Sequence, residues 1–168
     1  MAPLSRDRLF VMATFVVPFK PDGKTRLGDP ELAWAMFLDV RSACEQVGEV
    51  RICDAPGGQG SAVAALLATL EGPVAIVNSD VPCATPFELQ ELIDSTPALV
   101  AARDGTTNAL ALADAADYRP LYGPGSAERF GLRQLDLPGL SEDVDTLDDL
   151  MRLAAHVGPN TRSALVYA

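Results

Sequence analysis

Apolar runs alternate with amphipathic stretches along most of the chain. The first run, Leu9 to Val17, is continuous and rich in β-branched and aromatic residues, which predicts a buried strand. After a loop containing glycine and proline, Asp29-Pro30 predicts the start of a helix, with an aspartate cap and proline at the first helical position. Leu32, Met36 and Val40 then share one helical face.

The alternation continues to the C-terminus. Thr85, followed by Pro86 and Glu88, has the form of a capping box and predicts a helix to about Asp94. Thr146 predicts the cap of a last helix, which ends near 158. The other predicted elements are strands at 49–53, 73–77, 98–102, 108–112 and about 132–137, and a helix at 61–72.

Strands that read as unbroken apolar runs and alternate with helices predict an α/β fold. The sheet is expected to be parallel or mixed and covered by helices on both faces. The 168 residues show no internal repeat or linker, so we predict a single domain over 1–168. In open sheets of this kind, ligands bind outside the carboxyl ends of the strands, so the residues directly after each strand are the candidates for chemistry.

Composition limits the cell compartments and the binding partners that we expect for this protein. A formal net charge of −10 disfavours nucleic acid and anionic membranes as partners. The three cysteines form no C-x-x-C pair, which fits a reducing cytoplasm. The first apolar run lacks a following cleavage site and is far shorter than the ~20 residues of a membrane span. We therefore expect a cytoplasmic protein, and its oligomeric state stays open.

Carboxylates, glycines and cations follow the predicted strands, but no histidine does. The only histidine, His156, is expected to be a structural residue among apolar neighbours in the last helix, which disfavours Ser-His-Asp and Cys-His nucleophiles. Phosphoryl and nucleotidyl transfer suit the remaining residue types, because an ionised phosphate needs no general base as nucleophile. Carboxylates at strand ends could hold Mg²⁺, and glycine loops allow backbone amides to approach phosphates.

Each of these signals also has a structural alternative. Asp80, which follows the apolar run 73–77, could be a turn residue or a helix cap. The segment 57-GGQG-60 could be only a flexible turn, and it is not a Walker A loop. Asp143 and Asp145 have the spacing of residues on one side of an extended strand, but they would equally serve to cap the helix at Thr146. The cations of the N-terminal loop could simply be solvated.

Five motifs together resemble one family of enzymes. They are 17-VPFKPDGKTRL-27, 78-NSDVP-82, 104-DGTTNALAL-112, 122-YGPGS-126 and 143-DVDTLDDL-150. In this order they resemble the 2-phospho-L-lactate / phosphoenolpyruvate guanylyltransferase family of coenzyme F-420 biosynthesis, which is related to the molybdenum-cofactor nucleotidyltransferases. The resemblance covers nearly the whole chain. It implies a Rossmann-like nucleotidyltransferase fold of the nucleotide-diphospho-sugar-transferase type, a three-layer sandwich with a mostly parallel sheet.

The resemblance also implies a reaction, in which GMP passes from GTP to phosphoenolpyruvate or 2-phospho-L-lactate and pyrophosphate is released. Together with the positions of the strand ends, it assigns a role to each candidate residue. The magnesium ligands are Asp80, Asp143 and Asp145; the catalytic residues are Lys24, Arg26 and Asp80; the acceptor-binding residues are Thr107, Asn108, Gly123, Gly125 and Ser126; and the nucleotide-binding residues are Lys20, Gly58, Gln59, Gly60, Asn78 and Ser79.

Two segments are shorter than is usual in that family. Only three residues separate Asp54 from Gly58, in the region that recognises the base. The stretch 127-AERFGLRQL-135 is abbreviated, and Phe130 lies where a histidine is expected. Two alternatives therefore stay open: a related nucleotidyltransferase that uses CTP or accepts 3-phosphoglycerate, and a non-catalytic nucleotide-binding homologue.

Overall fold

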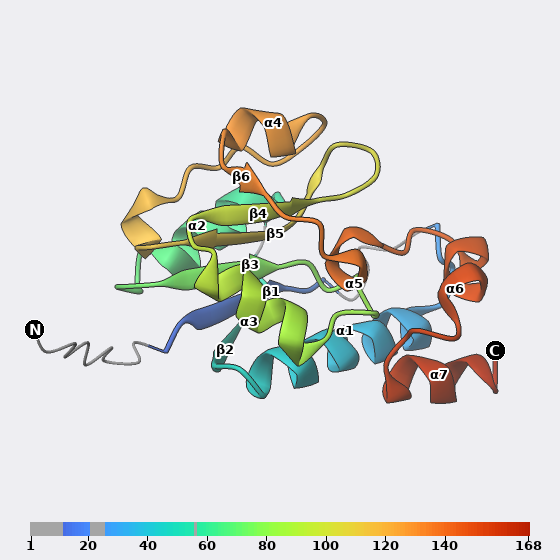
Figure 1. The fold of residues 1–168 in the computed structure, drawn as a ribbon. Helices are drawn as coiled ribbons and strands as arrows, with labels where there is room; N and C mark the ends of the chain where they lie inside the picture. Colours follow the sequence, from blue (N-terminus) through green and yellow to red (C-terminus); the bar gives the residue numbers. More distant parts are fainter. Residues whose placement is uncertain (1–11, 21–25, 56) are drawn as a thin grey trace, which may run out of the picture.

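A six-stranded sheet forms the centre of the protein in a computed structural model that describes residues 12–20, 26–55 and 57–168 (Figure 1). The strands are β1 (Thr14–Pro18), β2 (Glu49–Cys53), β3 (Val74–Val77), β4 (Ala98–Ala101), β5 (Thr107–Leu112) and β6 (Arg133–Gln134). Their order in the sheet is β2-β1-β3-β5-β4-β6, and only β5 runs antiparallel to its neighbours. The predicted α/β fold with a mostly parallel sheet is confirmed.

Helices cover both faces of this sheet. On one face lie α1 (Pro30–Glu45), α3 (Pro86–Asp94) and α5 (Pro138–Ser141); on the other lie α2 (Gln59–Leu67), the 3₁₀ helix η1 (Ala115–Asp117) and α4 (Ser126–Phe130). Two further helices, α6 (Leu147–Leu153) and α7 (Pro159–Leu165), lie near the N-terminal half of α1, beyond the end of the sheet (Figure 1). No helix in the described ranges is long and apolar enough to cross a bilayer.

The strands read as unbroken apolar runs because both faces of the sheet are buried. In β1, the side chains of Phe15 and Val17 enter the core beneath α1, whereas Val16 enters the core beneath α2. All three side chains have no exposed surface. Alternate residues of one strand therefore contribute to two different cores, and neither set tolerates a polar residue.

Two helix starts follow the local rules that predicted them. The Asp29 carboxylate accepts hydrogen bonds from the amides of Glu31 (2.8 Å) and Leu32 (3.3 Å) at the start of α1. Thr85 and Glu88 form the predicted capping box of α3, which ends at Asp94. The Glu88 carboxylate also accepts from the Gly139 amide at 2.8 Å, so the same cap fastens α5 to α3.

The C-terminal region differs from the prediction. The helix capped by Thr146 ends at Leu153 rather than near Gly158, and the separate helix α7 follows. His156 lies in the turn between α6 and α7 and is exposed, so its predicted place among apolar residues of a helix is wrong.

Several other boundaries also moved. The helix predicted at 61–72 is α2, which spans 59–67, and the strand predicted at 132–137 shrinks to two residues. The short helices α4 and α5 were not predicted. Of the first predicted strand, residues 9–11 lie outside the described residues.

Helix α7 exists because a buried carboxylate from α1 caps it. Asp39, 6% exposed, accepts hydrogen bonds from the Asn160 amide (3.0 Å), the Asn160 side chain (2.8 Å) and the Thr161 amide (2.8 Å). Gly158 lies against this carboxylate: a Cβ there would come within 2.4 Å of Asp39 Cγ. The Gly158 amide donates to the Pro82 carbonyl at 2.9 Å, so α1, α7 and the segment that follows β3 meet at one point.

We expect the substitution Asp39→Ala to lower the free energy of unfolding by about 2–4 kcal/mol, because it removes a helix cap and leaves a buried amide without an acceptor. Urea unfolding followed by circular dichroism measures this change. The control is Glu91→Ala, which removes an exposed carboxylate from α3 and should change stability by less than about 0.5 kcal/mol. An effect of Asp39→Ala as small as that of the control would contradict the capping role.

Candidate active site

The carboxyl ends of the parallel strands bring the predicted site residues to one edge of the sheet. Lys20 and Asp80 follow β1 and β3 there. Because β5 is antiparallel, its first residues, Thr107 and Asn108, lie at the same edge. The Asn78 amide donates to the Asn108 carbonyl at 2.9 Å, which extends the pairing of β3 with β5 by one residue. Residues far apart in the sequence thus meet at a ligand-binding position typical of open sheets.

Three carboxylates come together at this edge. Each of Asp80, Asp143 and Asp145 offers an oxygen, and these oxygens lie within 4.8 Å of one another. The Val144 side chain is fully buried in the same apolar cluster as Leu27, whereas the two flanking aspartates both offer an oxygen to the carboxylate cluster. The Val144 amide donates to the Asp80 carbonyl at 2.8 Å and ties the two segments together. Residues 143–145 therefore place both carboxylates on one side, although they form no strand.

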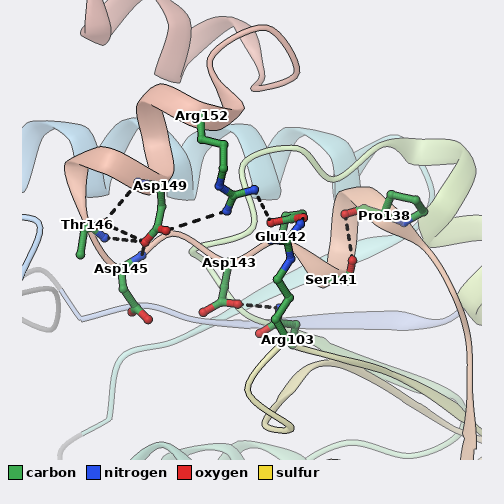
Figure 2. A network of polar contacts seen from close by, with 10 residues as sticks. Arg103, Pro138, Ser141, Glu142, Asp143, Asp145, Thr146, Asp149 and Arg152 are labelled. Atoms are coloured by element: carbon green, nitrogen blue, oxygen red, sulfur yellow. Dashed lines mark hydrogen bonds and ion pairs between the residues drawn. The ribbon is translucent and has the colours of Figure 1, made fainter.

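Helix α6 is capped by a different carboxylate. The Thr146 hydroxyl and the Asp149 carboxylate form its capping box, and Asp149 Oδ2 also accepts from the Asp145 amide at 3.1 Å (Figure 2). Asp143 Oδ1 accepts from the Asn108 side chain at 3.3 Å. The capping function is therefore supplied by Asp149, and the carboxylates of Asp143 and Asp145 face the cluster.

An ion-pair network holds the residue that precedes Asp143. Glu142 lies between the guanidinium groups of Arg103 and Arg152, with the Arg152 contact at 3.0 Å (Figure 2). Its side chain is 15% exposed, whereas that of Arg103 is 69% exposed. Arg103 belongs to the hairpin between β4 and β5, and Arg152 to α6. Glu142 therefore connects the hairpin and the helix at the residue next to Asp143.

The carboxylate cluster has the electrostatics and the chemistry of a divalent-cation site. Burial raises the pKa of Asp143, and the neighbouring negative charge of Asp80 raises it further, while the hydrogen bond from Asn108 acts in the opposite direction. Carboxylate oxygens are the ligands that Mg²⁺ prefers, and a bound cation would offset the mutual repulsion. The donor set thus fits magnesium.

Four of the six nucleotide-binding candidates line a cavity of about 310 Å³, whose wall also includes Asp80. Lys20, Gln59, Asn78 and Ser79 line it together with Phe19 and other residues. The side-chain Oδ1 of Asn78 accepts from Gln59 Nε2 at 2.7 Å, and its Nδ2 donates to the Thr107 backbone carbonyl at 3.1 Å. Asn78 therefore orients Gln59 at the wall of the cavity.

The other nucleotide-binding candidates lie in or beside the start of α2. The Lys20 ammonium donates to the carbonyl of Gly57, just before this helix. Gly58 is the N-cap of α2. Gly60 packs closely against Pro120, because a Cβ there would lie 3.5 Å from the proline Cβ, and it is not among the residues that line the cavity.

The acceptor-binding candidates form a second group along the same edge. The hydroxyl groups of Thr107 and Ser126 lie 2.9 Å apart and are hydrogen-bonded, with the two residues 2% and 0% exposed. The loop before Ser126 contains Gly123 and Gly125 at φ values of 115° and 70°, which side chains other than glycine rarely adopt. The Ala127 amide donates to the Gly105 carbonyl at 3.2 Å, so this loop is fastened to the hairpin between β4 and β5.

Known proteins resemble the chain over nearly its full length. It is 33% identical to the phosphoenolpyruvate guanylyltransferase of Streptomyces scabiei, over 90% of this chain and 94% of that protein. It is 31% identical to the 2-phospho-L-lactate guanylyltransferase of Methanosphaerula palustris, over 90% of this chain and 88% of that protein. The chain belongs to the phosphoenolpyruvate / 2-phospho-L-lactate guanylyltransferase family. No protein-family model matches it.

Solved structures show the same fold as this family member. A protein of Mycobacterium sp. strain JC1, described as a homologue of a Mycobacterium tuberculosis protein, superposes with a TM-score of 0.56 at 18% identity, over 94% of this chain and 98% of that one. The 4-diphosphocytidyl-2C-methyl-D-erythritol synthase of Anaerococcus prevotii superposes with a TM-score of 0.52 at 10% identity, over 84% and 95%. The nucleotidyltransferase fold is thereby confirmed.

This family member is short within the matched region. The alignment with the Streptomyces relative spans 205 positions but contains only 90% of the 168 residues, so roughly a quarter of its positions have no counterpart here. Phe130, at the position where a histidine was expected, packs edge-on against Tyr122 with ring centroids 5.6 Å apart. It is therefore a packing residue that holds α4 against the loop before it.

The basic N-terminal loop is described only in part. Lys24 lies outside the described residues. Arg26 is exposed, and the next residue, Leu27, is buried in the same cluster as Val144. The end of this loop therefore shares an apolar cluster with the segment that carries Asp143 and Asp145.

Sequence reasoning missed three charged residues at this edge: Arg103, Arg129 and Glu142. Their partners are carbonyl groups or distant charges, such as the pair Arg103 and Glu142, which is separated by 39 positions. No periodic pattern or short motif encodes such pairs. Arg129 follows 122-YGPGS-126 by three residues, and that proximity was the only available signal.

The raised pKa of Asp143 predicts a stability change that depends on pH. The folded state holds this proton more tightly than the unfolded chain, whose carboxyl pKa is ~3.9. The charged form therefore destabilises the fold progressively as pH rises through the folded pKa. We expect Asp143→Asn to stabilise the metal-free protein at pH 7 by about 0.5–2 kcal/mol, since the amide keeps the bond from Asn108 without the charge.

Thermal unfolding in EDTA measures this gain, which should shrink between pH 7 and pH 4.5. A matched control is Asp136→Asn, which removes an exposed carboxylate away from the cluster and should leave the melting temperature unchanged at both values. A gain that does not depend on pH would mean that repulsion within the cluster is not its cause.

Proposed function

We propose that this protein transfers GMP from GTP to phosphoenolpyruvate or 2-phospho-L-lactate in a magnesium-dependent reaction that releases pyrophosphate, as a step of coenzyme F-420 biosynthesis. Family membership supports the reaction type. The observation that carries the proposal is the carboxylate cluster, whose oxygens lie within 4.8 Å of one another between the cavity at Asp80 and the loop at Ser126. A divalent cation bound there would lie beside both substrates.

The chemistry requires an in-line displacement at phosphorus. An oxygen of the acceptor phosphate forms a bond to the α-phosphorus of GTP, and the bond from that phosphorus to the bridging oxygen breaks. Pyrophosphate leaves with the electron pair. The acceptor phosphate is already ionised above its second pKa of ~6, so no base has to remove a proton. Mg²⁺ held by the three aspartates would supply charge neutralisation for the phosphates.

The nucleotide is proposed to occupy the cavity beside Asp80. Asn78 orients Gln59 there by accepting from its Nε2. The side-chain oxygen of Gln59 is proposed to accept hydrogen bonds from the base. A cavity of about 310 Å³ accommodates part of a nucleotide, with the phosphates extending towards the carboxylates. Lys24 and Arg26 are proposed to neutralise the departing pyrophosphate, since Leu27 anchors the end of their loop near Val144.

The acceptor is proposed to bind between the loop at Gly123 and the start of β5. Thr107 and Ser126 are buried and bonded to each other, so their hydroxyl groups brace the site. Asn108 connects the acceptor side to Asp143, and the glycine loop offers backbone amides to a carboxylate or a phosphate. These groups suit a small acid with two anionic ends.

The deciding experiment is mass spectrometry of the products formed from GTP, MgCl₂ and a panel of acceptors. We expect a guanylyl diphosphate ester with phosphoenolpyruvate or 2-phospho-L-lactate. The substitution Asp80→Asn should lower turnover by at least about 100-fold, because it removes a charge from the metal site. A matched control is Asp94→Asn at the end of α3, where an amide can still accept from Gln90, and this variant should keep full activity.

The same panel separates the alternatives. Preference for CTP, or turnover with 3-phosphoglycerate, would assign the protein to a related nucleotidyltransferase. Absence of any product, combined with measurable GTP binding by calorimetry, would identify a non-catalytic homologue.

A base-free reaction predicts that His156 is dispensable. It is exposed and lines a separate cavity, together with Cys83, Glu88 and Arg152. We expect His156→Gln to lower kcat by no more than about three-fold, and the rate to reach a plateau near neutral pH that follows the phosphate of the acceptor. Steady-state rates across pH measure both. A folded but inactive His156→Gln variant would require an enzyme base and refute this mechanism.

A further inference from the structure

One exposed arginine holds the carbonyl groups of the loop before Ser126. The Arg129 guanidinium, from α4, donates to the carbonyls of Leu121 (2.8 Å) and Tyr122 (3.4 Å), and also to that of Pro124. Its own amide donates to the Gly125 carbonyl at 3.2 Å. Four carbonyl groups between residues 121 and 125 therefore accept hydrogen bonds from Arg129.

This arrangement fixes the direction of the amide groups. A peptide unit is planar and trans, so its N–H points opposite to its carbonyl. The unit that joins Tyr122 to Gly123 and the unit that joins Pro124 to Gly125 both direct their carbonyls at Arg129. The N–H groups of Gly123 and Gly125 therefore point away from the guanidinium, and neither donates a hydrogen bond to an acceptor in the described part of the chain.

The two glycines permit this conformation. Gly123 and Gly125 have φ values of 115° and 70°. A Cβ would lie 3.7 Å from the Arg129 guanidinium at Gly123 and 3.5 Å from it at Gly125, so the side chain fills the inner surface of the loop. Pro124 between them has no N–H, so the donors of residues 123–125 are the two glycine amides, and backbone amides that point the same way can bind an anion.

We propose that Arg129 is a positioning residue for the acceptor: by holding these carbonyls it presents the N–H groups of Gly123 and Gly125 to the carboxylate or phosphate of the bound acid. The inference rests on the proposed function. Arg129 is proposed to act through the loop and not by touching the acceptor, because both terminal nitrogens of its guanidinium donate to carbonyls of the loop. Lysine cannot replace it, since an ammonium lacks the planar fork that spans several carbonyls.

The kinetic test compares Arg129→Lys and Arg129→Gln with the wild type. We expect the KM for phosphoenolpyruvate to rise at least about 10-fold in both variants, with the KM for GTP within about two-fold and a smaller change in kcat. A matched control is Arg133→Gln, which removes an exposed arginine from β6 four residues later and should leave both constants unchanged. Thermal unfolding of each variant verifies that it is folded.

Two kinetic outcomes would overturn the proposal. If Arg129→Lys keeps the wild-type KM for phosphoenolpyruvate, a positive charge suffices and the fork has no role. If the KM values for GTP and phosphoenolpyruvate rise equally, the loop is a general structural element and not part of an acceptor site.

A second measurement separates this inference from the proposed reaction. Titration of ¹⁵N-labelled wild-type protein with phosphoenolpyruvate, without GTP, should shift the amide signals of Gly123 and Gly125, and Arg129→Lys should lose that shift. A wild type that shows the shift but no turnover would retain the inference and refute the proposed function. A wild type that turns over without any shift of these two amides would refute the inference alone.

Discussion

The close approach of three carboxylates is the constraint on which the site depends. Like charges at such distances repel each other by a few kcal/mol at the effective dielectric of a protein surface, so a restraint from the backbone helps to hold Asp80, Asp143 and Asp145 together. The core supplies that restraint: buried Val144 pins the segment between the two later aspartates, and its amide binds the Asp80 carbonyl. The proposed cation would therefore meet ligands that are already in place.

The restraint is distributed over elements that are remote in sequence. Asp149 accepts a hydrogen bond from the Asp145 amide. Glu142, the residue before Asp143, pairs with Arg103 of the β4–β5 hairpin and with Arg152 of α6. The Gly158 amide donates to the Pro82 carbonyl. The buried cap from Asp39 holds α7 in position for that last contact. Parts of the fold that do not touch a substrate thus determine where the carboxylates lie.

This chain has fewer residues in the matched region than the Streptomyces relative. Relatives carry segments that have no counterpart here, yet the cavity beside Asp80 keeps a wall of polar groups because Asn78 orients Gln59 from the neighbouring strand. Beside the loop that contains Gly123 and Gly125, the short helix α4 is fixed by the ring of Phe130 against Tyr122 and by the contacts of Arg129 with the loop.

The sequence by itself determined most of the strands, the longer helices and the candidate residues. Caps such as Asp29 and the Thr85–Glu88 box, and strands buried on both faces, depend on interactions within a few residues or on a regular period, so they can be read locally. The family motifs also lie within short windows. Only the tertiary structure decided the antiparallel direction of β5, which brings Thr107 and Asn108 to the edge that carries Asp80. The end of α6, the exposure of His156 and the ion pairs of Glu142 likewise depend on partners far along the chain, and a local pattern of polar and apolar residues does not specify which distant group a side chain will meet.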